Sequence, residues 1–247
     1  MTECIASLEV DAVAGSHIVF PWSRLPELRA GDTLVDVSGP ALQALSRHWL
    51  PGDATNPATF AWTFEALRSL QAGPLADLRI THDGYALAWI TLSDKGARGE
   101  REDTAGPLVP VIAGQSLKLC LASGYLLSDD PGPLKALLAE LALTQGFDLI
   151  VTSGGTGLAP RDLAPEATLA VIEKRLPGFE RAMTMESLSK TPHGAISRAV
   201  AGTLGKAVLL NLPGSPKAVR ECLGAVAPAL RHALEKLQGD PSDCAAR

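Results

Sequence analysis

The chain has few cysteines, and their spacing excludes two classes of protein. The four cysteines, Cys4, Cys120, Cys222 and Cys244, lie far apart and form no Cys-x-x-Cys pair. The sequence therefore indicates neither a zinc site nor a disulfide framework. Reduced thiols in a cytosolic protein are the simplest interpretation.

Long apolar runs and blocks of basic residues are also absent. The apolar run at 86–92 is far too short to cross a bilayer, and the first five residues lack the basic and apolar regions of a signal peptide. The formal net charge is −5, which disfavours nonspecific binding to nucleic acid or to an anionic membrane. We therefore expect a cytoplasmic protein with no nucleic-acid or membrane partner.

The few aromatic residues are unevenly distributed. Six of them, Phe20, Trp22, Trp49, Phe60, Trp62 and Phe64, precede Gly84 in this chain of 247 residues. This skew suggests two cores, and the Asp-Gly turn signal at 83–84 favours a boundary there, with domains at 1–83 and 84–240 and a flexible tail at 241–247. The alternative is a hairpin that pairs residues 79–80 with residues 85–92 across the same turn.

The first domain is predicted to be a small α+β domain of unknown function. Short strands are expected at 7–13, 17–20 and 33–37. Helix-like apolar spacing predicts helices at 40–49 and 56–70, and the second would begin with Asn56 as N-cap and Pro57 at the first helical position.

The second domain alternates short apolar runs with amphipathic stretches, which is typical of a mostly parallel sheet with crossover helices. The expected strands are 86–92, 124–127, 147–152 and 206–212. The expected helices are 107–119, 133–144, 165–176, 179–188 and 215–237, the last interrupted or kinked at Pro228.

A glycine-rich turn follows the strand at 147–152 and reads Thr152-Ser-Gly-Gly-Thr-Gly157. Three glycines in such a turn allow positive φ and let backbone N–H groups approach an anion. The turn lacks the Lys-Ser/Thr of a P-loop and the Gly-x-Gly-x-x-Gly fingerprint, so ordinary NTPase and Rossmann sites are excluded. A purely structural turn remains the alternative.

Acidic residues near predicted strand ends have both structural and functional interpretations. Asp162 next to Arg161 is either half of a solvated surface ion pair or a carboxylate that holds Mg²⁺ against phosphate oxygens. Asp129 and Asp130 precede a helix, where an aspartate is first of all a cap or turn residue. His193 has no recognisable nucleophile beside it in sequence and is best interpreted as a loop histidine.

Four ordered segments carry a resemblance to a known family: SDKGARGEREDTAGP at 93–107, TSGGTGLAPRDLAPEAT at 152–168, ISRAVAG at 196–202 and NLPGSP at 211–216. Together they resemble the molybdopterin adenylyltransferase family. The resemblance covers about residues 85–238 and implies a three-layer α/β/α domain that usually forms a trimer. The Gly-Thr-Gly turn and the Pro-Arg-Asp element favour the transferase over related insertase domains.

The resemblance implies a role for individual residues. Asp129, Asp162 and Ser197 would be catalytic, with Asp162 also contacting Mg²⁺, and the choice of Asp129 over Asp130 stays open. The residues implied to bind substrate or nucleotide are Ser93, Asp94, Asp103, Gly106, Thr152, Gly154, Gly155, Thr156, Gly157, Arg161, Arg198, Asn211, Pro213, Gly214 and Ser215.

The implied reaction joins molybdopterin and MgATP to give adenylylated molybdopterin and pyrophosphate. It asks the protein mainly for positioning and for electrostatic stabilisation. Molybdopterin and ATP would be the small-molecule partners, the chain would form a homotrimer, and other enzymes of the cofactor pathway are possible partners. The alternative is a non-catalytic molybdopterin-binding or scaffold module, because folds can persist when functions change.

Overall fold

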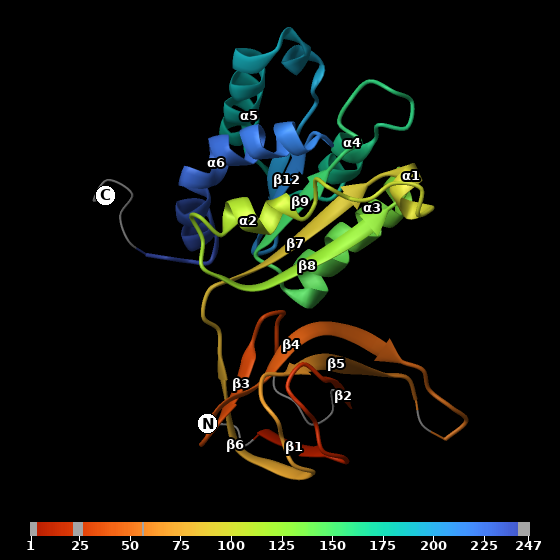
Figure 1. The fold of residues 1–247 in the computed structure, drawn as a ribbon, viewed down its shortest axis with the longest axis vertical. Coiled ribbons are helices and arrows are strands. Elements are labelled where there is room, and N and C mark those ends of the chain that lie inside the picture. Colours follow the sequence, from red (N-terminus) through yellow and green to blue (C-terminus); the bar gives the residue numbers. More distant parts are fainter. Residues whose placement is uncertain (1–3, 22–26, 56, 242–247) are drawn as a thin grey trace. The chain divides into compact units, whose positions relative to one another are not determined.

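The computed structural model describes residues 4–21, 27–55 and 57–241. The chain divides into two compact units, Met1–Gly84 and Tyr85–Arg247 (Figure 1). Trp22, Asn56 and residues 242–247 of the expected tail lie outside the described residues. No helix in the described part of the chain is long and apolar enough to cross a membrane.

The first unit is built on an antiparallel sheet. Its strands are β1 (Cys4–Leu8), β2 (His17–Pro21), β3 (Thr33–Asp36), β4 (Gly39–Leu50), β5 (Thr59–Ala66) and β6 (Gly73–Thr81), in the order β1-β6-β3-β4-β5-β2. The prediction of an α+β domain was wrong here, because residues 40–49 lie in β4, residues 59–66 of the second predicted helix form β5, and the described residues of this unit contain no helix.

A β-bulge explains the error at residues 40–49. In the pairing of β4 with β5, Ala44 lies opposite Phe64 and Ser46 lies opposite Thr63, so Leu45 is an extra residue. The extra residue breaks the two-residue alternation that identifies a strand. What remains in the sequence is an apolar spacing that resembles that of a helix.

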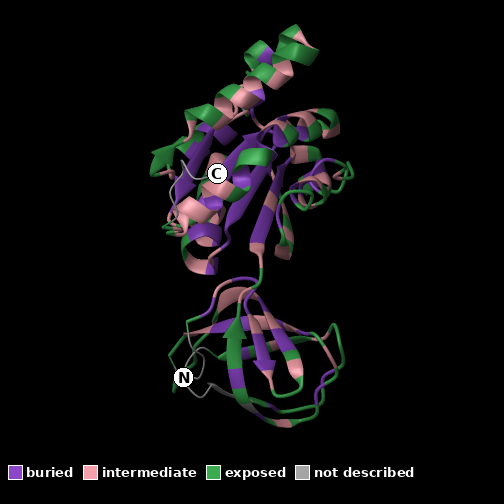
Figure 2. Ribbon diagram, turned by 90° about the vertical axis from the view of Figure 1, so that its left-hand side faces the viewer, coloured by how far each residue is buried: buried purple, intermediate pink, exposed green. Residues whose placement is uncertain are grey.

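The second unit is a three-layer α/β/α domain, as predicted (Figures 1 and 2). Its strands are β7 (Tyr85–Leu92), β8 (Leu119–Leu127), β9 (Leu149–Ser153), β10 (Lys174–Arg175), β11 (Ala201–Leu204) and β12 (Ala207–Leu212). Its helices are α1 (Asp94–Ala97), α2 (Leu108–Ala113), α3 (Pro131–Ala139) continued by a π-helix (Glu140–Gln145), α4 (Ala164–Leu169), α5 (Pro177–Lys190), a 3₁₀ helix (Pro192–Ile196) and α6 (Pro216–Leu237).

The sheet of this unit has the order β10-β11-β12-β9-β7-β8. Strands β12, β9, β7 and β8 are parallel, whereas β10, β11 and β12 pair antiparallel at one edge. Helices α2, α5 and α6 pack together over one face, and α3 and α4 pack together over the other. Figure 2 shows the resulting buried sheet between partly exposed helices.

Several predicted elements of the second unit have different bounds. Helix α2 ends at Ala113 and β8 begins at Leu119, so the helix expected at 107–119 was too long and the strand expected at 124–127 too short. Helix α4 ends at Leu169, and the hairpin strand β11 was not predicted. Helix α6 continues through Pro228.

Strands β6 and β7 belong to different sheets. The alternative hairpin across residues 82–84 was therefore wrong. β7 instead pairs with β8 and β9, and its first residues are held by the buried Asp148, which accepts a hydrogen bond from the Ala86 N–H at 2.7 Å and donates its own N–H to the Ala86 carbonyl at 2.9 Å.

Candidate active site

The glycine loop leaves the carboxyl end of β9 in a conformation that requires glycine. Gly154 has a φ of 103° and Gly155 a φ of 64°. A Cβ at Gly154 would lie 2.5 Å from the Leu92 carbonyl oxygen, and a Cβ at Gly214 would lie 3.1 Å from the Gly154 Cα. The loop therefore passes closely between the ends of β7 and β12.

Backbone donors of this loop are available to a ligand. The Gly154 N–H donates to the Leu212 carbonyl at 3.0 Å. In contrast, the N–H groups of Gly155, Thr156 and Gly157 have no hydrogen-bond acceptor within the part of the chain that the structure describes. Unpaired backbone donors at the carboxyl edge of a parallel sheet are typical of an anion site.

Arg198 forms hydrogen bonds to the carbonyl groups of the glycine loop. Its N–H donates to the Thr156 carbonyl at 3.0 Å, and its Nε donates to the Gly157 carbonyl at 2.9 Å. The rest of the guanidinium contacts the Asp162 carbonyl and the Glu166 carboxylate. With these partners, Arg198 fixes the path of the loop rather than projecting freely toward a ligand.

Asp162 closes the turn that follows the glycines. Its Oδ2 accepts a hydrogen bond from the Ala159 N–H at 2.8 Å, and a Cβ at Gly157 would approach that oxygen to 2.7 Å. The other oxygen, Oδ1, has no hydrogen-bond partner among the described residues. Asp162 is only partly buried, so Oδ1 is open to a cation or to water.

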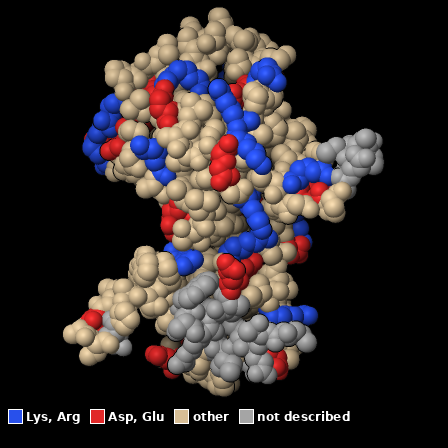
Figure 3. Space-filling view, turned by 180° about the vertical axis from the view of Figure 1, so that it is seen from behind, with Lys and Arg blue, Asp and Glu red and all other residues tan. Residues whose placement is uncertain are grey.

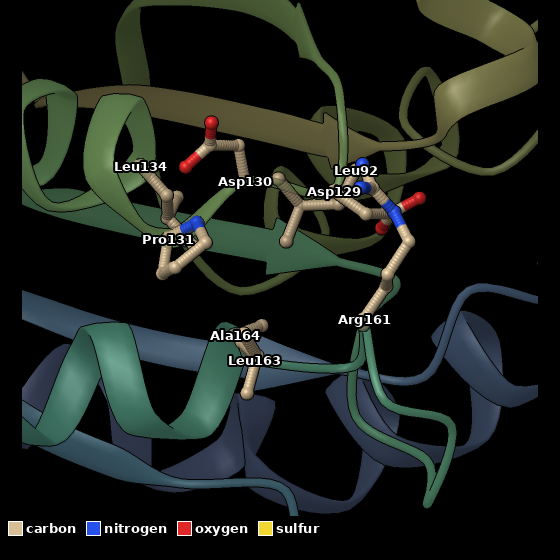
Figure 4. A pocket seen from close by; sticks show the side chains of 9 residues that line it. Leu92, Asp129, Asp130, Pro131, Leu134, Arg161, Leu163 and Ala164 are labelled. Carbon is tan, nitrogen blue, oxygen red and sulfur yellow. The ribbon is translucent and has the colours of Figure 1, made fainter.

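Asp129 and Asp94 form a reciprocal pair at the ends of β8 and β7. The Asp94 N–H donates to Asp129 Oδ2 at 3.0 Å, and the Asp129 N–H donates to Asp94 Oδ1 at 3.1 Å. Arg161 adds an ion pair with Asp94 at 2.7 Å, and its guanidinium is the main reason that the pKa of Asp94 is lowered. Figure 4 shows Arg161 extending from the loop toward Asp129, with Asp130 turned away.

Asp130 has a structural task. Its side chain is the N-cap of α3 and accepts a hydrogen bond from the Gly132 N–H at 2.9 Å. The crevice between Asp129, Asp130 and Arg161 has a volume of only about 10 Å³, which is room for little more than one water molecule. The crevice is therefore too small to enclose a nucleotide or a pterin.

A cleft of about 480 Å³ opens on the α6 side of the same edge. Ser93, Asp103, Gly214 and Ser215, all predicted binding residues, line it. This volume lies within the range of small-molecule sites. Two of the four are also caps, because Ser93 Oγ accepts from the Gly96 N–H at 3.0 Å and Ser215 Oγ accepts from the Ala218 N–H at 3.2 Å.

Asp103 shapes one wall of this cleft. Its Oδ2 accepts a hydrogen bond from Thr91 Oγ1 at 2.6 Å, and its Oδ1 accepts from the N–H groups of Ala105 and Gly106 at 3.1 and 2.9 Å. Gly106 is required because a Cβ there would lie 2.3 Å from the Asp103 carboxylate. Both carboxylate oxygens of Asp103 are thus already engaged.

Thr152 and Asn211 lie inside the domain. Asn211 is fully buried, and its Nδ2 donates to Thr152 Oγ1 at 2.9 Å and to Thr168 Oγ1 at 2.8 Å. These bonds join β12, β9 and α4 beneath the glycine loop. In the structure both residues support the loop, Asn211 Oδ1 has no hydrogen-bond partner among the described residues, and the predicted contact of the two residues with a ligand stays a prediction.

Ser197 and Arg198 line a separate hollow of about 530 Å³ between α4 and α5. The sequence-predicted residues therefore line three hollows: Asp129, Gly155 and Arg161 the small crevice, Ser93, Asp103, Gly214 and Ser215 the cleft on the α6 side, and Ser197 and Arg198 this one. Ser153 and Arg101, which line the cleft on the α6 side, were missed. Both lie within the motif segments, but nothing in the sequence distinguishes them from their neighbours.

Metal and charge patterns are consistent with small-molecule binding. Within residues 4–21, 27–55 and 57–241, no group of three or more His, Cys, Asp or Glu side chains forms a metal cluster. Figure 3 shows basic and acidic side chains interspersed on the face that it presents. A metal at this site would thus have to share its ligands with a bound substrate and with water, as Mg²⁺ does on nucleotide phosphates.

The fold and the edge of its sheet define a class: an α/β domain with a glycine loop at the carboxyl ends of parallel strands, the place where ligands bind in open sheets of this kind. Comparison with known proteins narrows that class. Residues 88–232, more than half of the chain, match the family model described as "Probable molybdopterin binding domain". The chain belongs to this family.

Individual relatives agree with the family assignment. A molybdopterin adenylyltransferase of Helicobacter pylori strain J99 is 38% identical over 152 residues, which are 61% of this chain and 86% of the relative. The Escherichia coli K12 protein of the same name is 34% identical over 141 residues, 57% of this chain and 72% of the relative. The crystal structure of the molybdopterin biosynthesis enzyme MoaB from Thermus thermophilus has 44% identity and a TM-score of 0.60, covering 64% of this chain and 99% of that one.

Proposed function

We propose that this protein is a molybdopterin adenylyltransferase of molybdenum cofactor biosynthesis. It transfers AMP from MgATP to the terminal phosphate of molybdopterin and releases pyrophosphate. The observation that carries the proposal is the set of unpaired N–H groups at Gly155, Thr156 and Gly157, in a family whose relatives bear this activity in their names.

The chemistry requires two anions to meet. An oxygen of the molybdopterin phosphate forms a bond to the α-phosphorus of ATP, and the bond from that phosphorus to the bridging oxygen of the β-phosphate breaks. Pyrophosphate leaves with the bonding electrons. The attacking phosphate is already anionic and needs no general base, so the protein's task is positioning and charge stabilisation.

Asp162 is the residue proposed to contact Mg²⁺. Its unpaired Oδ1 is a hard oxygen ligand of the kind that Mg²⁺ prefers, and one or two carboxylates suffice when phosphates and water complete the coordination. The metal would neutralise charge on the phosphates. The chain's own contribution is to hold that carboxylate still, through the Ala159 N–H, beside the unpaired loop amides.

Asp129 and Ser197 are proposed to act from the two flanks of the loop. Asp129 accepts a hydrogen bond from the Asp94 N–H, and Asp94 forms the ion pair with Arg161. Asp129 would thus position the Arg161 guanidinium at the end of β8. Ser197 lies in the hollow next to Arg198. Asp130 is assigned to capping α3 rather than to the reaction, because its carboxylate is already bonded to the Gly132 N–H.

We propose the same setting for the protein as for the activity. The chain would work in the cytoplasm as a homotrimer, with MgATP and molybdopterin as ligands. Other enzymes of the cofactor pathway would supply molybdopterin and consume its adenylylated form.

The direct test is incubation of the protein with molybdopterin, ATP and Mg²⁺, followed by detection of adenylylated molybdopterin. The Asp162→Asn variant should bind molybdopterin normally but lose AMP transfer by about a hundredfold or more, as expected when one preorganised charge is removed. Asp130→Asn is the matched control and should retain activity, because asparagine also caps helices.

Two outcomes would change the assignment. Wild-type transfer rates in Asp162→Asn would remove Asp162 from the mechanism. A wild-type protein that binds molybdopterin but forms no AMP ester with MgATP would favour the alternative, a non-catalytic binding or scaffold module.

A further inference from the structure

Ser153 is a buried polar residue whose hydroxyl has no partner among the described residues. The residue is 2% exposed, and its Oγ has no hydrogen bond in the described part of the chain. It lines the cleft on the α6 side of the sheet. A buried donor left unpaired is costly, and at the wall of a cleft a bound group can supply the missing hydrogen bond.

The first turn of α6 meets the same cleft. Gly214, Ser215 and Pro216 line it, and α6 is 22 residues long. The N–H groups of Ser215 and Lys217 have no hydrogen-bond acceptor among the described residues. The amino end of a long helix favours a negative charge through its dipole and its free N–H groups.

Arg101 supplies a positive side chain at the same cleft. It is exposed, lines the cleft, and forms no ion pair within the part of the chain that the structure describes. The two carboxylates of the lining are Glu102 and Asp103. Asp103 is fully engaged by Thr91 and by the N–H groups of Ala105 and Gly106, so it does not need Arg101 as a partner.

We infer that Ser153, Arg101 and the first turn of α6 form a subsite for a phosphate group of one of the two substrates. Serine Oγ donates one hydrogen bond, the helix end adds N–H donors, and the arginine fork adds charge-assisted bonds, a combination that suits a phosphate rather than a neutral group. Arg101 is thus a specificity-determining residue. This inference rests on the proposed function for the identity of the substrates.

Two phosphate sources fit this chemistry: the terminal phosphate of molybdopterin and the phosphates of ATP. The experiment measures the dissociation constants of molybdopterin and of a non-hydrolysable MgATP analogue separately, by calorimetry on the full chain. Arg101→Gln and Ser153→Ala should both weaken the same one of the two ligands, each by about tenfold, the size expected for loss of a hydrogen bond to a charged group, and leave the other within about twofold.

The controls separate a binding role from a structural one. Arg98→Gln removes a nearby exposed arginine that is already paired with Glu100 at 2.8 Å, and it should change neither dissociation constant. Arg101→Lys should recover part of the lost affinity. Without ligand, Ser153→Ala should unfold at a temperature no lower than that of wild type, because no protein partner loses a bond and an unpaired buried hydroxyl is removed, but it should gain less thermal stability when the affected ligand is added.

The inference is overturned if both dissociation constants stay within twofold of wild type in both variants, or if Arg98→Gln weakens binding as much as Arg101→Gln. It is also overturned if Ser153→Ala lowers the unfolding temperature without ligand while leaving both affinities intact. These binding measurements do not depend on turnover, so a protein that binds both ligands but transfers no AMP would refute the proposed function and leave the subsite supported.

Discussion

Gly154 has the most constrained position of any residue in the loop. Its φ of 103° lies in the region that disfavours residues with a side chain, and a Cβ would meet the Leu92 carbonyl oxygen at 2.5 Å. Backbone oxygen cannot move aside as a flexible side chain can. Glycine at this residue is therefore a requirement of the backbone path and holds whether or not a ligand is bound.

Gly154→Ala should destabilise the second unit by about 2–4 kcal/mol, because a positive φ and a backbone contact both penalise the methyl group. Denaturant unfolding followed by circular dichroism measures the change. Gly224→Ala is the matched control: Gly224 lies exposed in α6 with open space around its Cβ position, and it should stabilise by about 0.5–1 kcal/mol. Equal effects of the two variants would contradict the role given to the Gly154 backbone.

Arg161 stabilises the ionised form of the Asp94 carboxyl group. The guanidinium holds the pKa of Asp94 below its ordinary value. Because the pKa of Asp94 is lower in the folded state than in the unfolded state, the ion pair stabilises the fold at pH values above the ordinary aspartate pKa. This stabilisation is lost as the pH falls through the lowered pKa.

Arg161→Gln should raise the pKa of Asp94 toward that of an ordinary aspartate, and carboxyl chemical shifts measured by NMR across acidic pH would show it. Lys95→Gln, which removes a neighbouring basic residue that has no ion pair among the described residues, should shift that pKa much less. An unchanged titration of Asp94 in Arg161→Gln would show that the ion pair does not form in solution.

At the level of elements, the sequence predicted the second unit well and the first poorly, for a physical reason. Apolar runs such as 86–92 are buried on both faces, so their composition alone identifies a strand of a parallel sheet. In β4 the bulge at Leu45 disrupts the alternation, and only pairing with β3 and β5, which lie elsewhere in the chain, determines that it is a strand.

The site shows the same division. The glycine loop and Asp162 could be singled out from the sequence because they belong to one contiguous motif. Whether a polar residue faces a cleft or the interior depends on which strand lies beside it. Asn211 is enclosed because β9 and α4 flank β12, whereas Ser153 faces the cleft, and no local pattern distinguishes them.

Helix α6 contains a proline, Pro228, in its interior. Pro228 has no N–H to offer the Gly224 carbonyl one turn earlier, and both residues are exposed. An interior proline costs a helix up to about 3 kcal/mol. The packing of buried residues such as Leu223 and Leu230 compensates for this loss.

Pro228→Ala should raise the free energy of unfolding of the second unit by about 1–3 kcal/mol, because the missing hydrogen bond is restored on an exposed face. Thermal and denaturant unfolding both measure it. Pro216→Ala, at the first position of α6 where no such bond is lost, should have an effect of less than about 1 kcal/mol. A destabilised Pro228→Ala would mean that the proline ring itself contributes to packing.

At the scale of the whole molecule, the second unit contains every residue that we place in the site. Its first strand, β7, is held by contacts within the same unit. Asp148 forms hydrogen bonds with both the N–H and the carbonyl of Ala86. The Oδ1 of Asp148 also accepts a hydrogen bond from Gln238 Nε2 at 2.6 Å. The beginning of β7 and the end of α6 are thereby joined through one buried carboxylate.

A shortened chain that begins at Gly84 should fold and should retain AMP transfer, because a compact unit with its own core and a fixed first strand does not need a preceding segment for stability. Circular dichroism, size-exclusion chromatography and the transfer assay test this. The same shortened chain with Asp148→Ala should be less stable by about 1–3 kcal/mol, since the substitution leaves the buried Ala86 N–H without its acceptor. Aggregation of the unaltered shortened chain would indicate that the first unit is needed for folding.

Strand β7 has its two ends at opposite edges of the sheet: Tyr85 at the junction with the preceding unit, and Leu92 beside the cleft. Eight extended residues span about 26 Å. A segment joined ahead of Tyr85 is thus attached at the edge of the sheet opposite to the one that Leu92 occupies. In evolutionary terms, this edge is a place where one coding sequence can be appended to another without interrupting any loop on which the chemistry depends.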